Sequence, residues 1–103
     1  MNAVENQVRE LVNVELAAAN EKFPQFHSPH EGWAVMLEEY KELEEECEKI
    51  SKEMLEMFRN IRANDKCYAD CALSILLRAV YAACEAIQVS AMAEKLLNME
   101  ENR

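Results

Sequence analysis

Apolar residues recur at intervals of three and four along most of this 103-residue chain, which is the spacing of one face of a helix. The first such stretch runs from about Ala3 to Lys22. Phe23 precedes Pro24, and a residue before proline is pushed out of the helical region, so the first helix is expected to end there. Its apolar face is formed by Val4, Val8, Leu11, Val12 and Leu16.

A second helix has a clear start signal. Ser28 to Glu31 reads as a capping box, with serine at the N-cap, proline at the first helical position and a glutamate that reaches back to the N-cap amide. The helix is expected to continue to about Arg62. Its apolar positions alternate spacings of four and three, which predicts the packing seam of a bundle or coiled coil. The seam consists of Met36, Tyr40, Leu43, Cys47, Ile50, Met54, Met57 and Ile61.

A third helix is predicted from about Cys67 to Asn98, after a turn at residues 63–66. It is apolar almost all round, so it is expected to form the buried centre of the fold. The tail from Glu100 to Arg103 is expected to fray. The polar residues of this helix concentrate on one line, which contains Asp70, Ser74, Tyr81, Glu85 and Gln88, with Arg78 at its edge.

The composition supports an all-α fold. One glycine and two prolines, with half of the residues apolar, leave little material for β-hairpins. We therefore predict a single helical domain over residues 1–103 with three main helices. A chain of this size buries a modest core, so we expect a homodimer or tetramer that completes a four-helix or larger bundle.

The charge limits the possible partners. A net charge of −9 and the lack of a basic patch exclude a nucleic-acid backbone or an anionic membrane as partner. No uninterrupted run approaches the ~20 apolar residues of a membrane span. The N-terminal residues lack a basic region followed by an apolar one, so no secretion signal is expected. A cytoplasmic location follows from these expectations.

Four cysteines fall in predicted helices with apolar neighbours: Cys47, Cys67, Cys71 and Cys84. We interpret them as buried free thiols in a reducing compartment. Cys67 and Cys71 have the i, i+4 spacing that can hold a soft metal. Structural zinc usually takes four nitrogen or sulfur ligands, however, and no histidine or second pair stands near them in sequence.

The side chains around the capping box are expected to be structural. His27 and His30 fall in the loop and the first helical turn, where contact with a base or phosphate is the alternative role. Trp33 and Tyr40 are expected in the core or in an interface between chains, with base stacking as the alternative.

Three carboxylates, Glu39, Glu42 and Glu46, lie along one side of the second helix. Glu39 and Glu42 have no Lys or Arg three or four residues away, and Glu46 has only Lys49. Like charges at this spacing repel each other unless something cationic lies among them. This acidic stripe predicts a divalent-cation site, and a solvated acidic face is the alternative.

Glu85 and Gln88 place oxygen donors at i, i+3 on the third helix. A carboxylate on a mostly apolar helix is costly unless it is paired or binds a metal ion. If the two helices pack side by side, their donors can converge on one hard cation, and oxygen-only donors favour Mg²⁺ or Mn²⁺ over zinc. The alternative for Glu85 is a buried ion pair with Arg78 of the partner subunit.

Two segments carry a family resemblance. HSPHEGWAVMLEEYKEL, residues 27–43, resembles the opening of MazG-like proteins in the all-α nucleotide pyrophosphohydrolase superfamily, particularly the short phage-type branch. EAIQVSAMA, residues 85–93, is similar to the start of the second motif helix of that branch. The superfamily pattern is E-x-x-E on one helix and E-x-x-D on a later one. The resemblance places Glu39 and Glu42 in the first motif and Glu85 in the second, with Gln88 where the family has aspartate.

The resemblance implies Mg²⁺-dependent hydrolysis of a nucleoside triphosphate to a monophosphate and pyrophosphate. Glu39, Glu42, Glu85 and Gln88 would hold the ion, with Glu46 as a supporting ligand, and Glu39 or Glu42 would be the general base for water. Gln88 offers a carbonyl oxygen without the charge of aspartate. Two alternatives therefore stay open: a non-catalytic relative that binds nucleotide, metal or protein, and a structural coiled-coil adaptor.

Overall fold

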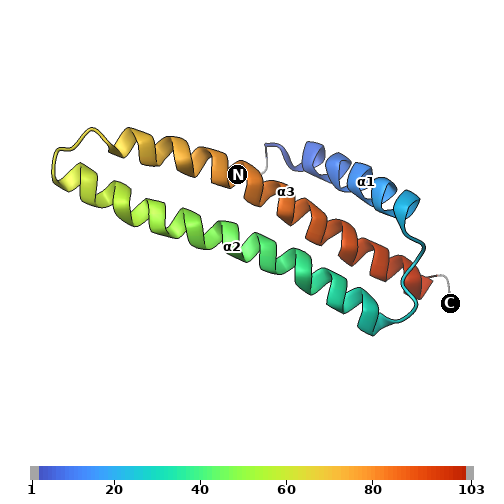
Figure 1. Cartoon of the computed structure of the whole chain (residues 1–103). Coiled ribbons are helices and arrows are strands. Elements are labelled where there is room, and N and C mark those ends of the chain that lie inside the picture. Colours follow the sequence, from blue (N-terminus) through green and yellow to red (C-terminus); the bar gives the residue numbers. More distant parts are fainter. Residues whose placement is uncertain (1–2, 102–103) are drawn as a thin grey trace. The chain divides into compact units, whose positions relative to one another are not determined.

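The computed structural model describes residues 3–101, which form three helices and no strand (Figure 1). Helix α1 spans Glu5–Lys22, α2 spans Pro29–Arg62 and α3 spans Tyr68–Glu101. The all-α prediction is confirmed, and the helix boundaries lie within three residues of those expected. Helix α3 ends three residues later than expected, so Glu100 and Glu101 of the predicted tail are its last helical residues, and the last two tail residues lie outside the described part of the chain.

The contacts group the chain into two compact units. The first unit consists of Met1–Tyr40 and Glu85–Arg103, and the second consists of Lys41–Cys84. Helices α2 and α3 each contribute a segment to both units.

The first unit contains the hydrophobic core. Val12 of α1, Phe26 of the α1–α2 loop and Ala91 of α3 are buried, and Ala91 has no exposed surface. Helix α2 contributes Val35 and Met36, which pack against this core. The core side chains of the first unit are Val12, Phe26, Ala91, Met92 and Met99, with Leu16, Ala19, Val35, Met36, Ile87 and Leu96 packed around them.

A buried lysine anchors the loop between α1 and α2. Lys95 is 3% exposed, and its Nζ donates to the carbonyl oxygen of Phe23 at 3.4 Å and lies 4.9 Å from the ring centroid of Phe26. The side-chain amide of Gln25 donates to the Lys95 carbonyl oxygen at 3.0 Å. Phe23 has extended backbone angles, as expected of a residue before proline, so α1 ends where the sequence predicts.

The capping box at the start of α2 is confirmed with one difference. The Glu31 amide donates to Ser28 Oγ at 3.2 Å, which is the expected N-cap bond. The Glu31 carboxylate reaches back to His27, where it lies 2.9 Å from Nδ1 and accepts a bond from the backbone amide at 3.4 Å. The side-chain bond to His27 holds the pKa of Glu31 below its usual range.

The second unit is a pair of helical segments joined by the predicted turn. Asn64 adopts the left-handed conformation with φ of 55°, and the Asp65 amide donates to the Asn60 carbonyl oxygen at 2.8 Å. These features end α2 in the manner of a Schellman motif, in which asparagine is the common replacement for glycine. Asp65 Oδ1 then accepts a bond from the Cys67 amide at 2.9 Å at the start of α3.

The prediction that α3 forms the buried centre is wrong for the part of α3 in the second unit. Leu73 is 58% exposed, Leu76 57% and Val80 53%, and within residues 41–84 only Cys71 is buried. The exposure has a simple cause, because a segment that is apolar all round needs neighbours on every side and the second unit supplies one other helix.

The seam on α2 is covered on one side only. Its members alternate in burial along the helix: Met36, Leu43, Ile50 and Met57 are half-buried, whereas Tyr40, Cys47, Met54 and Ile61 are exposed. The alternation means that every second seam position still presents apolar surface to solvent.

Two further burial predictions need correction. Among the cysteines, which are all free, only Cys71 is buried, and burial raises the pKa of its thiol. The pKa of exposed Cys67 is raised by a hydrogen bond to Asp65. Trp33 is 61% exposed and Tyr40 48%, so neither lies in a core within this chain. The other location expected for Trp33 and Tyr40, an interface between chains, stays a prediction.

Helix α3 is apolar enough to cross a membrane by length and composition, because an 18-residue window within Tyr68–Glu100 has a mean hydropathy of 1.5. A count of uninterrupted apolar residues does not reveal this, because polar residues are spread along the helix. Core helices of soluble proteins pass the same test.

Replacement of Gly32 by alanine tests the packing of the first unit. A Cβ at this buried position would lie 2.9 Å from Leu96 Cδ1 and 2.9 Å from Phe26 Cδ2. Helix propensity alone predicts that Gly→Ala stabilises by roughly 1 kcal/mol, whereas overpacking costs roughly 1–3 kcal/mol. We expect Gly32→Ala to lower the melting temperature, measured by circular dichroism. Ser51→Ala, at an exposed position of α2, is the control and should raise or preserve it. An equal rise in both variants would contradict the close packing.

Candidate metal centre

Two predicted ligands meet within the first unit. Glu39 lies near the end of the α2 segment of this unit and Glu85 at the start of the α3 segment. A carboxylate oxygen of Glu39 lies within 4.8 Å of one of Glu85, and both side chains are half-buried. The pairing of an α2 acid with an α3 acid is therefore as the sequence predicts.

Gln88 lies between these two carboxylates. The Gln88 amide is oriented with its NH₂ group toward the two acids, because only this orientation gives them a hydrogen-bond donor. Nε2 then donates to Glu39 Oε2 at 2.6 Å and to Glu85 Oε2 at 3.0 Å. A neutral amide thus bridges two acids. Rotation of the amide by half a turn would direct Oε1 into the same space.

Glu42 lies one turn after Glu39 on the continuous helix α2, and each offers a carboxylate oxygen within 4.8 Å of the other's. Residues three apart on a helix share a face, so the helix itself brings Glu42 to the Glu39 side. Glu42 is exposed, in contrast to half-buried Glu39 and Glu85. We call Glu39 and Glu85, which both belong to the first unit, the carboxylate cluster; Glu42 neighbours Glu39 along the helix.

Glu46 has a different environment, in the second unit. Its Oε1 lies 3.7 Å from Lys49 Nζ and its Oε2 lies 3.7 Å from Arg78 Nη1, and 15% of its side chain is exposed. Lys49 is the one basic neighbour that the sequence analysis identified for Glu46. The structure assigns Glu46 to ion pairs rather than to the carboxylate cluster, and it pairs Arg78 with Glu46 of the same chain.

The donor set of the carboxylate cluster fits a hard divalent cation. All donors are oxygens, and two carboxylates this close carry like charges that a cation neutralises. Ligand oxygens at ~2.1 Å from Mg²⁺ lie at most about 4.2 Å apart, so oxygens within 4.8 Å need only a small inward shift. Among the described residues, the group of His, Cys, Asp and Glu side chains found close enough to share a metal ion contains no cysteine.

The first unit also contains a cavity of about 410 Å³. Val35 lines it one helical turn before Glu39, and Met92 lines it one turn after Gln88; Glu39, Glu85 and Gln88 are not themselves among the lining residues. Sequence reasoning missed Lys95, which also lines the cavity; the available signal was a lysine whose neighbours about one helical turn away, Ala91, Met92 and Met99, are apolar. The other lining residues are Ala19, Phe23, Pro24, Phe26, His27, Glu31 and Glu38.

Comparisons with protein-family models, with curated proteins and with solved structures found no significant match.

Thermal unfolding with divalent cations tests the carboxylate cluster. A ligand at ten times its Kd stabilises the folded state by about 1.4 kcal/mol, which corresponds to several degrees for a domain of this size. We expect Mg²⁺ or Mn²⁺ to raise the melting temperature of the wild type and to leave that of Glu39→Gln and Glu85→Gln unchanged. Glu48→Gln removes the same charge at an exposed position of α2 and should respond like the wild type. A similar rise in all four proteins would show general screening of acidic charge.

Proposed function

We propose that the chain is a MazG-like nucleoside triphosphate pyrophosphohydrolase, dependent on Mg²⁺ or Mn²⁺, that releases a nucleoside monophosphate and pyrophosphate. The observation that carries the proposal is the approach of Glu39 and Glu85 to within 4.8 Å, with Gln88 bridging them. These residues occupy the motif positions that the family resemblance assigns, although they are separated by more than forty residues of sequence.

Burial divides the roles of the acids. Half-buried Glu39 and Glu85 are suited to be fixed ligands, and Gln88 can add its carbonyl oxygen after the amide rotates. Bound there, Mg²⁺ would neutralise phosphate charge and lower the pKa of a water molecule. Exposed Glu42 is suited to orient that water and to take its proton. The water oxygen then forms a bond to the α-phosphorus as the bond to the bridging oxygen breaks, and pyrophosphate leaves with that oxygen.

The 410 Å³ cavity offers room for the nucleoside next to the acids that would hold the phosphates. The Phe23 and Phe26 side chains supply apolar surface, and Lys95 supplies a hydrogen-bond donor. A site of this size with an apolar lining and a few polar groups is typical of small-molecule sites.

Self-association and a cytoplasmic location are part of the same proposal. The uncovered half of the α2 seam and the small number of buried side chains support a homodimer or tetramer. Nucleoside triphosphates and free Mg²⁺ are available together in the cytoplasm. Nucleic acid and membrane are not among the partners proposed.

One observation favours a second candidate, a non-catalytic module that binds nucleotide or protein. The Gln88 amide already donates to both Glu39 and Glu85, so these acids have a hydrogen-bond donor between them without any ion. An aspartate at position 88 would add a third negative charge in place of this donor, which would strengthen the demand for a cation.

Pyrophosphate release from a panel of canonical and modified nucleotides separates the two candidates. With Mg²⁺ or Mn²⁺, we expect release by the wild type and a loss of roughly 100-fold or more in Glu42→Gln and Glu39→Gln. Gln88→Asp should strengthen Mg²⁺ binding, because it restores a charged ligand. Glu48→Gln is the matched control and should retain wild-type rates. Absence of release with every nucleotide would favour the binding module.

A further inference from the structure

Apolar side chains on α3 of the second unit are exposed in a dense group. They lie on consecutive turns of the helix, and no element within residues 41–84 covers them. A contiguous apolar surface of this kind is uncommon on a monomeric protein. The exposed members are Leu73 at 58%, Leu76 at 57%, Leu77 at 46%, Val80 at 53% and Tyr81 at 49%.

The exposed area of the whole chain indicates how large a partner is needed. The chain exposes 7831 Å², whereas a folded monomer of 11.9 kDa is expected to expose roughly 5,900 Å². The excess exposed area is roughly 1,900 Å² per chain. If two copies buried this excess against each other, the interface would bury roughly 3,800 Å² in total. This value lies in the range of obligate homodimers, about 2,000–5,000 Å².

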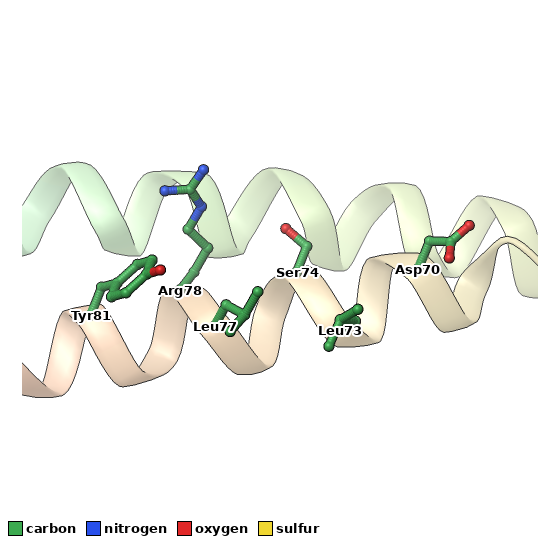
Figure 2. Close-up of a pocket in the computed structure, with 6 residues that line it drawn as sticks. All are labelled: Asp70, Leu73, Ser74, Leu77, Arg78 and Tyr81. Atoms are coloured by element: carbon green, nitrogen blue, oxygen red, sulfur yellow. The ribbon is translucent and has the colours of Figure 1, made fainter.

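A groove on α3 gives the contact a specific location. The groove has a volume of about 430 Å³ and runs between two rows of side chains spaced four residues apart. One row is Asp70, Ser74 and Arg78, which project from the same edge of the helix in Figure 2, and the other is Leu73, Leu77 and Tyr81. Rows of this spacing form the ridges and grooves through which helices pack on each other.

The polar row is complementary to itself. Asp70 and Arg78 carry opposite charges and lie four residues before and four residues after Ser74. Suppose that two α3 helices pack antiparallel about a two-fold axis that passes Ser74. Position 70 of each copy then lies opposite position 78 of the other copy, so two acid–base pairs form. The small serine at the centre allows the two helices to approach closely.

We propose that this groove is the contact surface for a second copy of the chain, with α3 packed antiparallel on α3 about a two-fold axis at Ser74. Asp70 of one copy pairs with Arg78 of the partner subunit, and the Leu73 and Leu77 rows of the two copies cover each other. Such an interface is isologous, so each contact occurs twice and the assembly closes as a dimer. This contact rests on the self-association included in the proposed function and gives it a location; it does not involve the carboxylate cluster, so its failure would leave the test by pyrophosphate release intact.

A membrane is the other environment that would cover an apolar helix. It fits the groove less well, because Asp70 and Arg78 both line it. Each charge placed in the hydrocarbon core costs roughly 2.5–3.5 kcal/mol. Arg78 is also held by Glu46 at 3.7 Å, which keeps a second charge beside the helix.

Charge reversal across the axis tests the contact. Sedimentation velocity should give the wild type a mass of about twice 11.9 kDa. Asp70→Arg brings like charges together at both symmetric contacts, so we expect its dimer dissociation constant to rise at least tenfold, and the same for Arg78→Asp. An equimolar mixture of the two variants restores an acid–base pair at each contact and should form heterodimers with near wild-type affinity.

Control variants separate the loss of this contact from a general change in charge and from misfolding. Glu48→Arg makes the same charge change as Asp70→Arg at an exposed site on α2 and should leave the dimer unchanged. If Arg78→Asp fails to fold because its bond to Glu46 is lost, Asp70→Arg alone decides the outcome by its dissociation constant. Any of three results would overturn the proposal. The wild type could be monomeric, Asp70→Arg could dimerise with wild-type affinity, or the wild type could sediment with phosphatidylcholine vesicles.

Discussion

The closeness of Glu39 and Glu85 is the constraint on which the candidate site depends. Two ionised carboxylates within 4.8 Å of each other repel by roughly 1 kcal/mol in bulk water and by several kcal/mol in a partly buried site. The first unit holds them there through apolar packing: Gly32 allows Phe26 and Leu96 to come close to α2, and Lys95 fixes the loop that leads into it. Gln88 offsets part of the repulsion with two hydrogen bonds. A cation would offset more of it, because it neutralises both charges at once.

The second unit has a different balance of forces. It has almost no buried apolar surface of its own, and its one internal cross-helix ion pair joins Glu46 and Arg78. Apolar helix faces that remain exposed in one chain gain stability only when another surface removes them from water. The first unit therefore contains the half-buried acids Glu39 and Glu85, Glu42 lies at the start of the second unit, and the second unit contains the exposed apolar surface proposed for association. Separate substitutions in the two units can test these roles independently.

The sequence predicted what depends on local rules. The Ser28 cap, the end of α1 at Phe23 and the turn at Asn64 each follow from a few adjacent residues, and all three are confirmed. The i, i+3 spacing predicted that Glu39 and Glu42 share a face. Glu85 was predicted as a ligand because a carboxylate on a mostly apolar helix needs a partner, and the family resemblance then assigned it a motif position. Burial was predicted poorly, because the apolar character of α3 does not reveal how many neighbours cover it. The ion pair of Glu46 is formed with Arg78, thirty-two residues later in the sequence. The hydrogen bond of Lys95 is formed with a loop about seventy residues earlier. Contacts between such distant residues cannot be predicted from a local pattern.

Paramagnetic relaxation by Mn²⁺ tests the carboxylate cluster most directly, because it reports position rather than affinity alone. In NMR spectra of the isotope-labelled chain, substoichiometric Mn²⁺ should broaden the Gln88 side-chain amide signals first, together with the backbone amides around Glu39, Glu42 and Glu85. Signals from the exposed acidic stretch around Glu44 and Glu48 should remain sharp at the same Mn²⁺ concentration. Equal broadening along all acidic positions of α2, with Gln88 unaffected, would contradict a divalent-cation site at the cluster.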